Sequence, residues 1–570
     1  MGKRRLERLL TVAALFGPLY AATAILPQAI AADRPGPVVH TTEGPVQGLV
    51  RNGVDEFLGI PYATPPVGDL RWQPPKQHGG WTQTLSATKF GSTCPQITEL
   101  GVFAGPVSLT EDCLYLNVFT TRTNPAPNAK KLPVLLWIHG GGLFDGETND
   151  YDASALVKGG QAGPTVVVTI NYRLGLLGYV GHPALDAEGH NFGNYGLMDQ
   201  QEALRWVQHN IAAFGGDPGN VTVGGQSAGS TSTAAAVISP ASAGLFHRAI
   251  FESGPLLTVA PLALAEQRGV NFANAAGCGS GGTAQVASCL RALSVEKILS
   301  LQGTAAANGP YVNGLMVDGT VLPISGDVAW STGKFNRMPI MNGAVADEGA
   351  FTASIDELFF GPMTAERYST LVKATYGGPA GPGTGPPSYP DGTPAKVMAK
   401  YPLSAYPTPG AAWTAVATDS NVCRHPYLND HASQFVSLYA YEFAYKKAPW
   451  YFPPVRFDHG AAHTIDIQFL FKNWHGGVLG VNHPAELSRQ ETALSDELVA
   501  AWTNFAATGN PNGKGNAPWP RYTDAAGAPA VLSENVPALG TFTLAQWSAN
   551  HHCDFWTGNQ QNGGILRFQP

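Results

Sequence analysis

The chain has 570 residues, of which 44% are hydrophobic and 13% are charged, and its formal net charge is −7 at pH 7. This composition provides a large buried core and excludes an intrinsically disordered chain, a coiled coil and a multispanning membrane protein. The charge balance is mildly acidic and Lys and Arg cluster only at the extreme N-terminus, which argues against nucleic acid as a partner.

The first 31 residues have the succession of regions that is typical of a secretory signal peptide. Its basic residues are Lys3, Arg4, Arg5 and Arg8. A mostly apolar stretch follows over residues 9–25, and Ala29 and Ala31 fit a small-residue cleavage site. The alternative is a membrane anchor, but the stretch is shorter than the ~20 apolar residues that a spanning helix needs. We therefore expect a cleaved signal peptide over residues 1–31, a secreted protein (extracellular or periplasmic), and a single mature domain over residues 32–570.

Six cysteines follow the leader: Cys94, Cys113, Cys278, Cys289, Cys423 and Cys553. An even number behind a signal peptide indicates three structural disulfides, although six cysteines allow fifteen pairings by count. The short separations within Cys94–Cys113 and Cys278–Cys289 favour two local loops, and Cys423–Cys553 is the pair that remains. The alternative is that some of these residues are buried free thiols.

Short β-rich runs alternate with helical patterns from residue 132 to residue 342. Residues 134–138 (VLLWI) and 166–170 (VVVTI) are continuous apolar runs, which are typical of strands buried on both faces. Further strands are expected at 221–223, 249–251, 340–341 and 438–443, and helices at 196–214 and 228–238. This alternation predicts a mostly parallel sheet covered by helices.

A glycine loop is expected directly after the strand at 134–138. Residues 139–142 read His-Gly-Gly-Gly, which matches the loop that donates backbone N–H groups to an oxyanion. Gly141 and Gly142, together with the N–H of Ala228, are the candidate donors of an oxyanion hole. Glycine suits these positions because a Cβ atom would crowd the substrate carbonyl. We expect His139 itself to be structural rather than a catalytic base.

The motif with the most chemical content lies between the strand at 221–223 and the helix at 228–238. Residues 225–229 (GQSAG) match G-x-S-x-G, and a strand before and a helix after are the context that a nucleophile elbow requires. Small residues around Ser227 permit a sharp turn that exposes its hydroxyl at the helix N-terminus. Ser227 is therefore the candidate nucleophile, and a hydroxyl in this role needs a neighbouring base.

These motifs belong to a longer resemblance. The chain is similar to the type-B carboxylesterases, the carboxylesterase/cholinesterase group of α/β hydrolases, along nearly the whole mature chain. The matching stretches are 59–63 (GIPYA), 66–72 (PVGDLRW), 111–118 (EDCLYLNV), 214–218 (FGGDP), 502–505 (WTNF) and 508–511 (TGNP). The resemblance implies the α/β-hydrolase fold, with a central, mostly parallel sheet flanked by helices and long loop or helical insertions over the active site. It also implies two local disulfide loops.

The resemblance selects the acid of a catalytic triad. Residues 347–349 (DEG) resemble the family stretch in which the Glu orients the catalytic His, so Glu348 is the expected acid. On chemistry alone, Asp347 would rank equally, because either carboxylate could orient an imidazole.

The same resemblance selects the base. Residues 462–467 (AHTIDI) resemble the segment that carries the catalytic His, which favours His463 over His459. The chain order Ser227, Glu348, His463 is the one that α/β hydrolases use. The family commonly has Gly after this His, whereas this chain has Thr464, so the geometry of the local turn is left open.

We therefore expect a serine carboxylic-ester hydrolase that forms an acyl-enzyme with a small-molecule ester. We expect no cofactor, no metal, no nucleic-acid partner and no stable membrane anchor, and the sequence leaves the oligomeric state open. His459 and His463 are four residues apart, but no third metal ligand is evident. Two alternatives remain: an amidase, carbamate hydrolase or peptidase with the same triad, and a non-catalytic interaction protein with the same fold.

Two positions predict that neutral esters are preferred over choline esters. Cholinesterases hold the cationic head group with a Trp on the loop closed by the first disulfide and with a Glu before the nucleophile. The loop between Cys94 and Cys113 has no Trp, and its nearest aromatic residue counted back from Cys113 is Phe103. The residue before the nucleophile is Gln226, which is neutral. Aromatic residues at 450–452 (WYF) are the alternative source of a cation site.

The segment 376–394 (YGGPAGPGTGPPSYPDGTP) is too rich in Gly and Pro for a regular element. It could be an interdomain linker, but a β-like run follows it at 438–443. We expect a long surface loop within one domain.

Overall fold

A computed structural model of the chain describes the following residues: 34–97, 105–189, 193–255, 259–302, 314–377, 389, 392–472, 474, 476–480, 485–514 and 516–557. The predicted leader at 1–31, Phe103 and most of the Gly/Pro-rich segment 376–394 lie outside these residues. No helix within the described ranges is long and apolar enough to cross a membrane.

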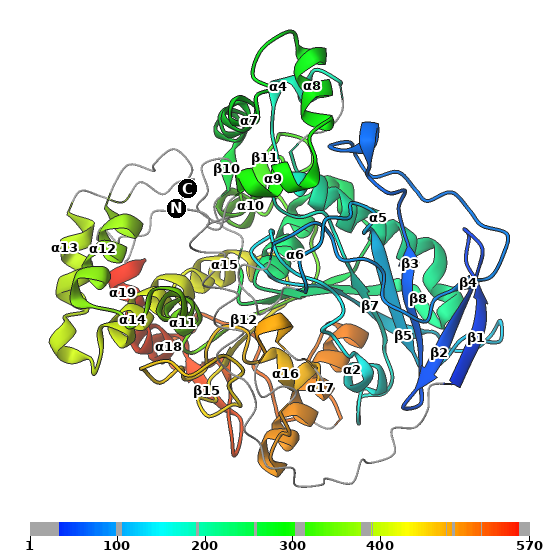
Figure 1. Cartoon of the computed structure of the whole chain (residues 1–570). Coiled ribbons are helices and arrows are strands. Elements are labelled where there is room, and N and C mark those ends of the chain that lie inside the picture. The colour runs from blue at the N-terminus through cyan, green and yellow to red at the C-terminus, as the bar shows by residue number, and fades with distance from the viewer. Residues whose placement is uncertain are drawn as a thin grey trace, which may run out of the picture.

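A sheet of 13 strands runs through the molecule (Figure 1). Its order is β1-β2-β3-β5-β7-β6-β8-β9-β12-β13-β14-β15, and β4 pairs with β2. The neighbours from β7 to β14 are parallel, whereas the other neighbours in this order are antiparallel. The short β4 lies parallel to β2. The strands are β1 (Arg34–His40), β2 (Pro45–Arg51), β3 (Val54–Pro61), β4 (Leu85–Ser86), β5 (Tyr115–Thr120), β6 (Leu132–Ile138), β7 (Val166–Ile170), β8 (Gly216–Gln226), β9 (Arg248–Glu252), β12 (Ile340–Val345), β13 (Leu438–Phe443), β14 (Pro529–Glu534) and β15 (Gly540–Thr543). A small separate sheet pairs β10 (Ala260–Pro261) with β11 (Met316–Val317).

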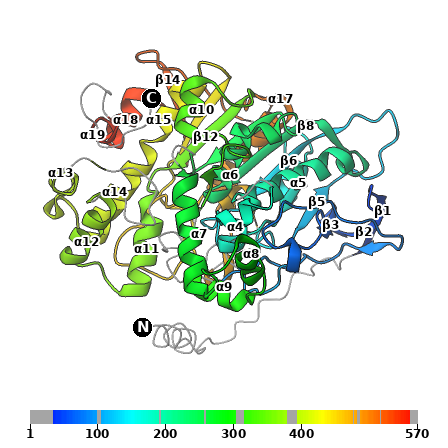
Figure 2. The same ribbon diagram turned by 90° about the horizontal axis from the view of Figure 1, so that it is seen from above.

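Helices cover both faces of the sheet and extend beyond its ends (Figures 1 and 2). The α-helices are α2 (Ser154–Lys158), α3 (Gly175–Gly178), α4 (Pro183–Asp186), α5 (Tyr195–Asn210), α6 (Ala228–Ile238), α7 (Leu262–Ala276), α8 (Thr283–Arg291), α9 (Val295–Gln302), α10 (Gly326–Thr332), α11 (Gly349–Phe360), α12 (Ala365–Tyr376), α13 (Thr393–Lys400), α14 (Pro409–Val422), α15 (His425–Ala432), α16 (Ile467–Leu470), α17 (Arg489–Thr508), α18 (Leu544–Asn550) and α19 (Cys553–Trp556). Short 3₁₀ turns are η1 (Gly68–Leu70), η2 (Ile211–Phe214), η3 (Pro240–Ser242), η5 (Leu403–Ala405) and η6 (Gly477–Leu479).

The central strands are buried on both faces, and their side chains alternate between two hydrophobic cores. In β6, Val134, Leu136 and Ile138 belong to the core that also contains residues of α5 and α6. Leu135 and Trp137 belong to the opposite core, with residues of α2, α16 and α17. This double burial explains why the strand is a continuous apolar run rather than an alternating one.

A third core joins α11, α12, α13 and α14 to the C-terminal helix α19. These helices form one group at the end of the molecule opposite the antiparallel strands β1, β2 and β3, as both views show (Figures 1 and 2). The disulfide between Cys423 and Cys553 lies inside this core and fixes the C-terminal helix to the end of α14.

All three expected disulfides are present in the structure. They join Cys94 to Cys113, Cys278 to Cys289 and Cys423 to Cys553, with Cα–Cα distances of 4.9, 5.6 and 5.1 Å.

Several elements have the bounds that the sequence predicts. The strands at 166–170 and 438–443 and the helix at 228–238 coincide with β7, β13 and α6. The strand expected at 221–223 is part of the longer β8. The helix expected at 196–214 is α-helical only as far as Asn210, after which η2 tightens the chain before Gly215, whose φ is +83°.

Candidate active site

Four segments meet where the parallel strands end, which is the edge where open α/β sheets place their sites. Ser227 follows β8, the His139 loop follows β6, and Glu348 comes three residues after β12. The segment with His463 lies beyond β13 and returns to this edge through a bridge between Asp347 and Ala462. The topology therefore brings together residues that are far apart in the sequence.

Ser227 occupies a sharp turn between β8 and α6. Its φ is +57° and its ψ is −122°, a backbone conformation that residues other than glycine rarely adopt. Two hydrogen bonds fix it: the N–H of Ser227 donates to the carbonyl of Glu252 at 2.8 Å, and the N–H of Thr231 donates to the carbonyl of Ser227 at 3.0 Å. The surrounding structure thus holds a strained serine at the first turn of a helix.

Glycines on either side of Ser227 allow this turn to pack tightly. A Cβ atom on Gly229 would lie 2.0 Å from the carbonyl oxygen of Ile138, and one on Gly225 would lie 2.5 Å from the same atom. Both clashes are with backbone at the end of β6. Only glycine at these two positions lets α6 approach β6 so closely.

The loop after β6 is held by its own backbone and by His139. The ring of His139 is buried, stacks on Tyr172 with centroids 4.6 Å apart, and has Nδ1 2.8 Å from the carbonyl oxygen of Gly140. Burial lowers the pKa of His139 to about 4, so the ring is neutral. This arrangement agrees with the structural role expected for His139.

The N–H groups of Gly141, Gly142 and Ala228 make no hydrogen bond to any other residue that the structure describes. The N–H of Ala228 belongs to the first turn of α6, where an intrahelical acceptor is lacking. Gly141 and Gly142 have φ of +103° and +63°, respectively, which favour glycine. Donors of this kind can stabilise a negative oxygen at a helix N-terminus.

Glu348 and His463 form a close pair. Nδ1 of His463 lies 2.5 Å from Oε2 of Glu348, and the other carboxylate oxygen accepts the N–H of Val345 at 3.1 Å. Burial alone would raise the pKa of Glu348, but the charge and hydrogen bond of His463, together with smaller effects such as the hydrogen bond from the N–H of Val345, outweigh it and the pKa is lowered. Burial alone would lower the pKa of His463, but the charge and hydrogen bond of Glu348 raise it above its ordinary value.

Asp347 has different partners. Its Oδ1 lies 2.9 Å from Nζ of Lys446, and its Oδ2 accepts the N–H of Ala461 at 2.9 Å. The geometry therefore separates the two carboxylates that sequence chemistry ranked equally: Glu348 contacts the imidazole, and Asp347 anchors the segment that carries it.

The side-chain amide of Gln226 also contacts the ring of His463. Its Nε2 lies 3.3 Å from Nε2 and 3.5 Å from Nδ1 of His463. Within the described part of the chain, no hydrogen bond joins the hydroxyl of Ser227 to this ring. Catalytic hydrogen bonds are commonly loose before substrate binds, and the ring contacts the residue next to Ser227.

The turn after His463 shows how Thr464 replaces the usual glycine. Thr464 has φ of +79°, the left-handed conformation that favours glycine. Its hydroxyl is hydrogen-bonded to the buried hydroxyl of Tyr451, which also lies 3.4 Å from the carbonyl oxygen of His463. On another side, the ring of Phe351 lies 5.5 Å from the imidazole. These contacts hold the strained turn and the orientation of the imidazole.

Comparison with known proteins shows the family to which the chain belongs. The family model described as the carboxylesterase family matches residues 35–556. The chain belongs to the carboxylesterase family. It is 33% identical to the para-nitrobenzyl esterase of Bacillus subtilis (strain 168), over 88% of this chain and 95% of the relative. It is 30% identical to the human cocaine esterase, over 92% and 91% of the two chains, and 33% identical to the fumonisin B1 esterase of Sphingopyxis macrogoltabida, over 88% and 87%.

This carboxylesterase is therefore a carboxylic ester hydrolase with the α/β-hydrolase fold. The family and fold expected from the sequence are confirmed, including the mostly parallel central sheet. Membership of this family also implies that the substrate is a small-molecule ester.

His459 lies outside the pair formed by His463 and Glu348. Its ring stacks on Trp450 with centroids 4.3 Å apart, and burial lowers its pKa. Among the residues that the structure describes, no group of three or more His, Cys, Asp or Glu could hold a metal ion.

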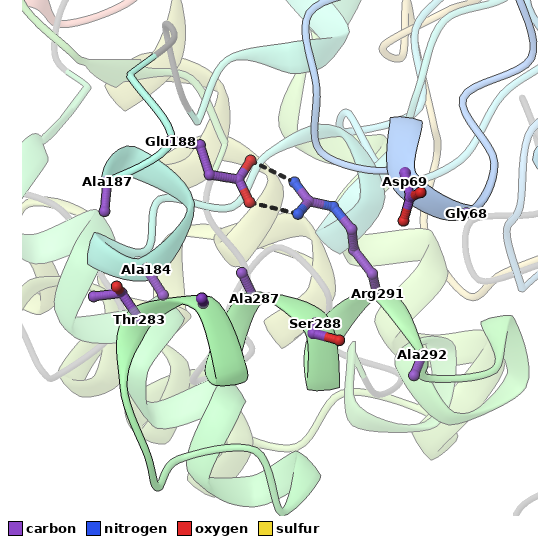
Figure 3. A pocket seen from close by; sticks show the side chains of 11 residues that line it. Gly68, Asp69, Ala184, Ala187, Glu188, Thr283, Ala287, Ser288, Arg291 and Ala292 are labelled. Atoms are coloured by element: carbon purple, nitrogen blue, oxygen red, sulfur yellow. Dashed lines mark hydrogen bonds and ion pairs between the residues drawn. The ribbon is translucent and has the colours of Figure 1, made fainter.

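A cavity of about 440 Å³ opens on the surface of the carboxylesterase between η1, α4 and α8 (Figure 3). Arg291 and Glu188 form a bidentate ion pair there, with distances of 2.5 and 2.8 Å, and Asp69 lies beyond Arg291. None of the candidate catalytic or oxyanion residues lines this cavity. It is therefore separate from the candidate active site.

The sequence did not reveal the part played by the end of β9. The carbonyl of Glu252 fixes Ser227, and the side chain of Glu252 is fully buried. The signal in the sequence was a carboxylate directly after the apolar run 249–251. A charged residue at the end of a buried strand is unusual, because charged side chains are rarely fully buried unless they are paired.

Proposed function

We propose that this carboxylesterase is a secreted serine hydrolase in which Ser227, His463 and Glu348 form the catalytic triad. The observation that carries the proposal is the 2.5 Å contact between Nδ1 of His463 and Oε2 of Glu348, beside an elbow that exposes a strained serine. The contact leaves Nε2 of His463 as the nitrogen that can accept a proton.

In the first half of the reaction, Oγ of Ser227 attacks the carbonyl carbon of the ester while Nε2 of His463 takes the hydroxyl proton. The carbonyl π electrons move to oxygen, and the N–H groups of Gly141, Gly142 and Ala228 stabilise this oxyanion. Each such donor is worth roughly 10² to 10³ in rate. Collapse of the intermediate breaks the bond to the alcohol, which leaves with the proton from His463.

In the second half, water attacks the acyl-enzyme and His463 repeats both proton transfers, which releases the acid and restores Ser227. Glu348 supports each step because its negative charge stabilises the imidazolium and its hydrogen bond fixes the tautomer with the proton on Nδ1. The raised pKa of His463 and the lowered pKa of Glu348 are the shifts that this charge pairing produces.

We propose neutral esters as the preferred substrates. Gln226 places a neutral amide, rather than a carboxylate, before the nucleophile. The three similar proteins named above are esterases, which favours an ester over an amide substrate. The signal-like leader at 1–31 and the three disulfides support export.

The decisive experiment compares Ser227→Ala with Ser288→Ala, which makes the same change on the exposed surface of α8. Hydrolysis of a neutral p-nitrophenyl ester should fall at least about 10³-fold in S227A and remain at the wild-type level in S288A. A serine-directed organophosphate should label the wild-type protein once, at Ser227. Substantial turnover by S227A, or labelling elsewhere, would refute the triad. A matched ester and amide pair then measures the selectivity, and N-terminal sequencing of the exported protein locates the cleavage site.

A further inference from the structure

Three carboxyl groups that the proposed reaction does not use lie close to the His463–Glu348 pair. Glu252 ends β9, Asp466 lies three residues after His463, and Glu534 ends β14. Their exposed fractions are 0%, 3% and 2%, respectively. Buried carboxylates are costly unless they are paired with a cation or carry a proton, so this cluster requires a specific arrangement of charge.

Glu252 is connected to the candidate nucleophile through the sheet. In the pairing of β8 with β9 it lies directly opposite Gln226, and its carbonyl accepts the N–H of Ser227 at 2.8 Å. Opposed residues on neighbouring strands point to the same face of a sheet. The side chain of Glu252 therefore lies on the face where Gln226 contacts His463.

All four oxygens of the carboxyl groups of Glu252 and Asp466 are buried, and none has a hydrogen-bond partner among the N–H and O–H donors that the structure describes. Each of the two carboxyl groups has the other as its neighbour, within hydrogen-bonding range. Ionised carboxylates are acceptors only, so a hydrogen bond between two of them requires one proton. Two buried negative charges at this distance would also repel each other strongly. One member of the pair must therefore be protonated and the other can remain ionised.

The titratable groups around the pair come from several elements: Glu348 and His463, Glu534 on β14, Tyr441 on β13, Tyr151, and Tyr451. Of these groups only His463 can become a cation, and it is already paired with Glu348. The tyrosines are neutral because burial raises their pKa well above 10. Among the residues that the structure describes, the groups that act on the two carboxyl groups therefore include no second positive charge.

We propose that Glu252 is a positioning residue of this esterase: it keeps a proton at neutral pH and donates it to the ionised carboxylate of Asp466. This hydrogen bond holds Asp466, and with it the turn that carries His463, in one orientation. It also keeps only one member of the Glu252–Asp466 pair ionised, and the charge of Asp466 adds to that of Glu348 in favouring the protonated form of His463 during proton transfer. The inference rests on the role of His463 as the base.

The direction of the pKa shifts supports the same assignment of the proton. Burial, followed by the charge of Asp466, raises the pKa of Glu252 well above its ordinary value. Burial raises the pKa of Asp466 to about 6, although the hydrogen bond from Glu252 opposes this rise. These directions favour the neutral form of Glu252 and leave Asp466 as the ionised partner, whose charge contributes to the raised pKa of His463.

The test compares two isosteric variants, Glu252→Gln and Asp466→Asn, with Asp496→Asn as a control for the loss of an exposed carboxylate on α17. The pH dependence of kcat/KM for a neutral ester is measured from pH 5 to 9. In E252Q the amide can still donate to Asp466, so the acid limb should stay within about 0.2 pH units of wild type. In D466N a negative charge is lost, so the acid limb should move to lower pH by about half a unit or more. D496N should not move it.

A shift in E252Q as large as that in D466N would mean that Glu252 is ionised, and the proposal would be wrong. Glu252→Leu removes the donor at similar volume and should lower kcat about tenfold or more, with a smaller change in KM. Full activity of E252L would also overturn the positioning role. If E252L does not fold, the comparison of E252Q with D466N still decides.

A readout that does not depend on activity separates this inference from the proposed function. Infrared spectra of wild type and E252Q are compared at pH 7.5. The wild type should show a carbonyl stretching band of a protonated carboxylic acid that is missing from E252Q, whereas the bands of other buried acids such as Glu534 should appear in both spectra. If the wild type hydrolyses no ester but shows this band, the proposed function fails while the protonation of Glu252 stands. If the two spectra are identical in this region, the protonation is refuted.

Discussion

Asp347 and Glu348 are adjacent in the chain, but their carboxylates bind different groups. Oε2 of Glu348 lies 2.5 Å from Nδ1 of His463, whereas Oδ2 of Asp347 accepts the N–H of Ala461, two residues before that histidine. One acid therefore acts on the imidazole directly, and its neighbour fixes the backbone of the segment that presents it. Substitutions at the two positions should have very different effects.

Glu348→Gln should lower kcat by about 10³ to 10⁴, because the amide carries no charge and does not fix the tautomer of His463. Asp347→Asn keeps an oxygen for the N–H of Ala461 and loses only an ion pair with Lys446, whose side chain is 59% exposed. Such an exposed pair is worth about 0 to 1 kcal/mol, so kcat/KM should stay within about fivefold of wild type. Steady-state kinetics with a neutral ester measures both. The opposite ranking would transfer the role of triad acid to Asp347.

The pH dependence of activity should reflect the raised pKa of His463. Burial lowers this pKa, but Glu348 raises it more, so its value lies above 6.5. Only the neutral imidazole can accept the proton of Ser227, so kcat/KM should rise with pH through this pKa and fall below it. In Glu348→Gln the remaining activity should show an acid limb at lower pH, because the stabilising charge is gone. An acid limb below pH 6 in the wild type would contradict this charge pairing.

Much of the fold could be predicted because strands that are buried on both faces consist of continuous apolar runs, which are visible in the sequence. The strands at 166–170 and 438–443 are fully buried, and their apolar runs predict both strands with the observed bounds. The antiparallel strands β1, β2 and β3 were not predicted from periodicity. They lie at the edge of the sheet, where the side chains alternate irregularly between buried and exposed positions, so the hydrophobic pattern is weak.

The site was only partly predictable for a different reason. Ser227 and the glycines of residues 139–142 are encoded locally, because the turn and the close backbone approach require particular residue types. The pairing of Glu252 with Asp466 depends instead on the register of β8 and β9 and on the return of the His463 segment to the strand ends. Neither relation can be read from the residues near either acid.

Gly229→Ala should impair the enzyme by displacing the elbow. The new Cβ would lie 2.0 Å from the carbonyl oxygen of Ile138 and 2.8 Å from that of His139, so α6 must move away from the oxyanion loop. A displacement of about 1 Å can cost roughly 10² in rate, and overpacking costs about 1 to 3 kcal/mol. Gly79→Ala is the control, because no atom lies within 4 Å of its Cβ. Equal kcat and thermal midpoints for the two variants would show that the close approach is not required.

Alkaline pH should lower the stability of the folded protein near its C-terminal helices, because His551 loses its proton. Its Nε2 lies 2.5 Å from Glu442 and its Nδ1 lies 3.3 Å from Asp419, so both ring nitrogens face carboxylates. Burial alone would lower the pKa of His551, but the hydrogen bonds to Asp419 and Glu442 raise it to about 9. The folded state therefore binds this proton more tightly, and the stabilisation is complete below about pH 6.5 and disappears as pH rises through about 9.

A shift of this size corresponds to roughly 3 kcal/mol. The thermal midpoint of wild type should therefore exceed that of His551→Gln at pH 7, and the difference should shrink by pH 10. Midpoints are compared at one scan rate, with the disulfides intact. A difference that stays constant between pH 7 and pH 10 would show that His551 does not titrate in this range.

Choline esters should be poorer substrates than their uncharged isosteres. The loop between Cys94 and Cys113 supplies no Trp, and Gln226 supplies no charge, so two attractions for a quaternary ammonium are missing. The aromatic run at 450–452 does not replace them: one face of Trp450 stacks on His459, and Tyr451 and Phe452 are buried in the core. The measurement compares kcat/KM for butyrylcholine and for 3,3-dimethylbutyl butyrate, in which carbon replaces the charged nitrogen, at low and high salt. We expect the neutral ester to be preferred at both salt concentrations. A preference for the cation that weakens with salt would instead reveal a negatively charged binding site.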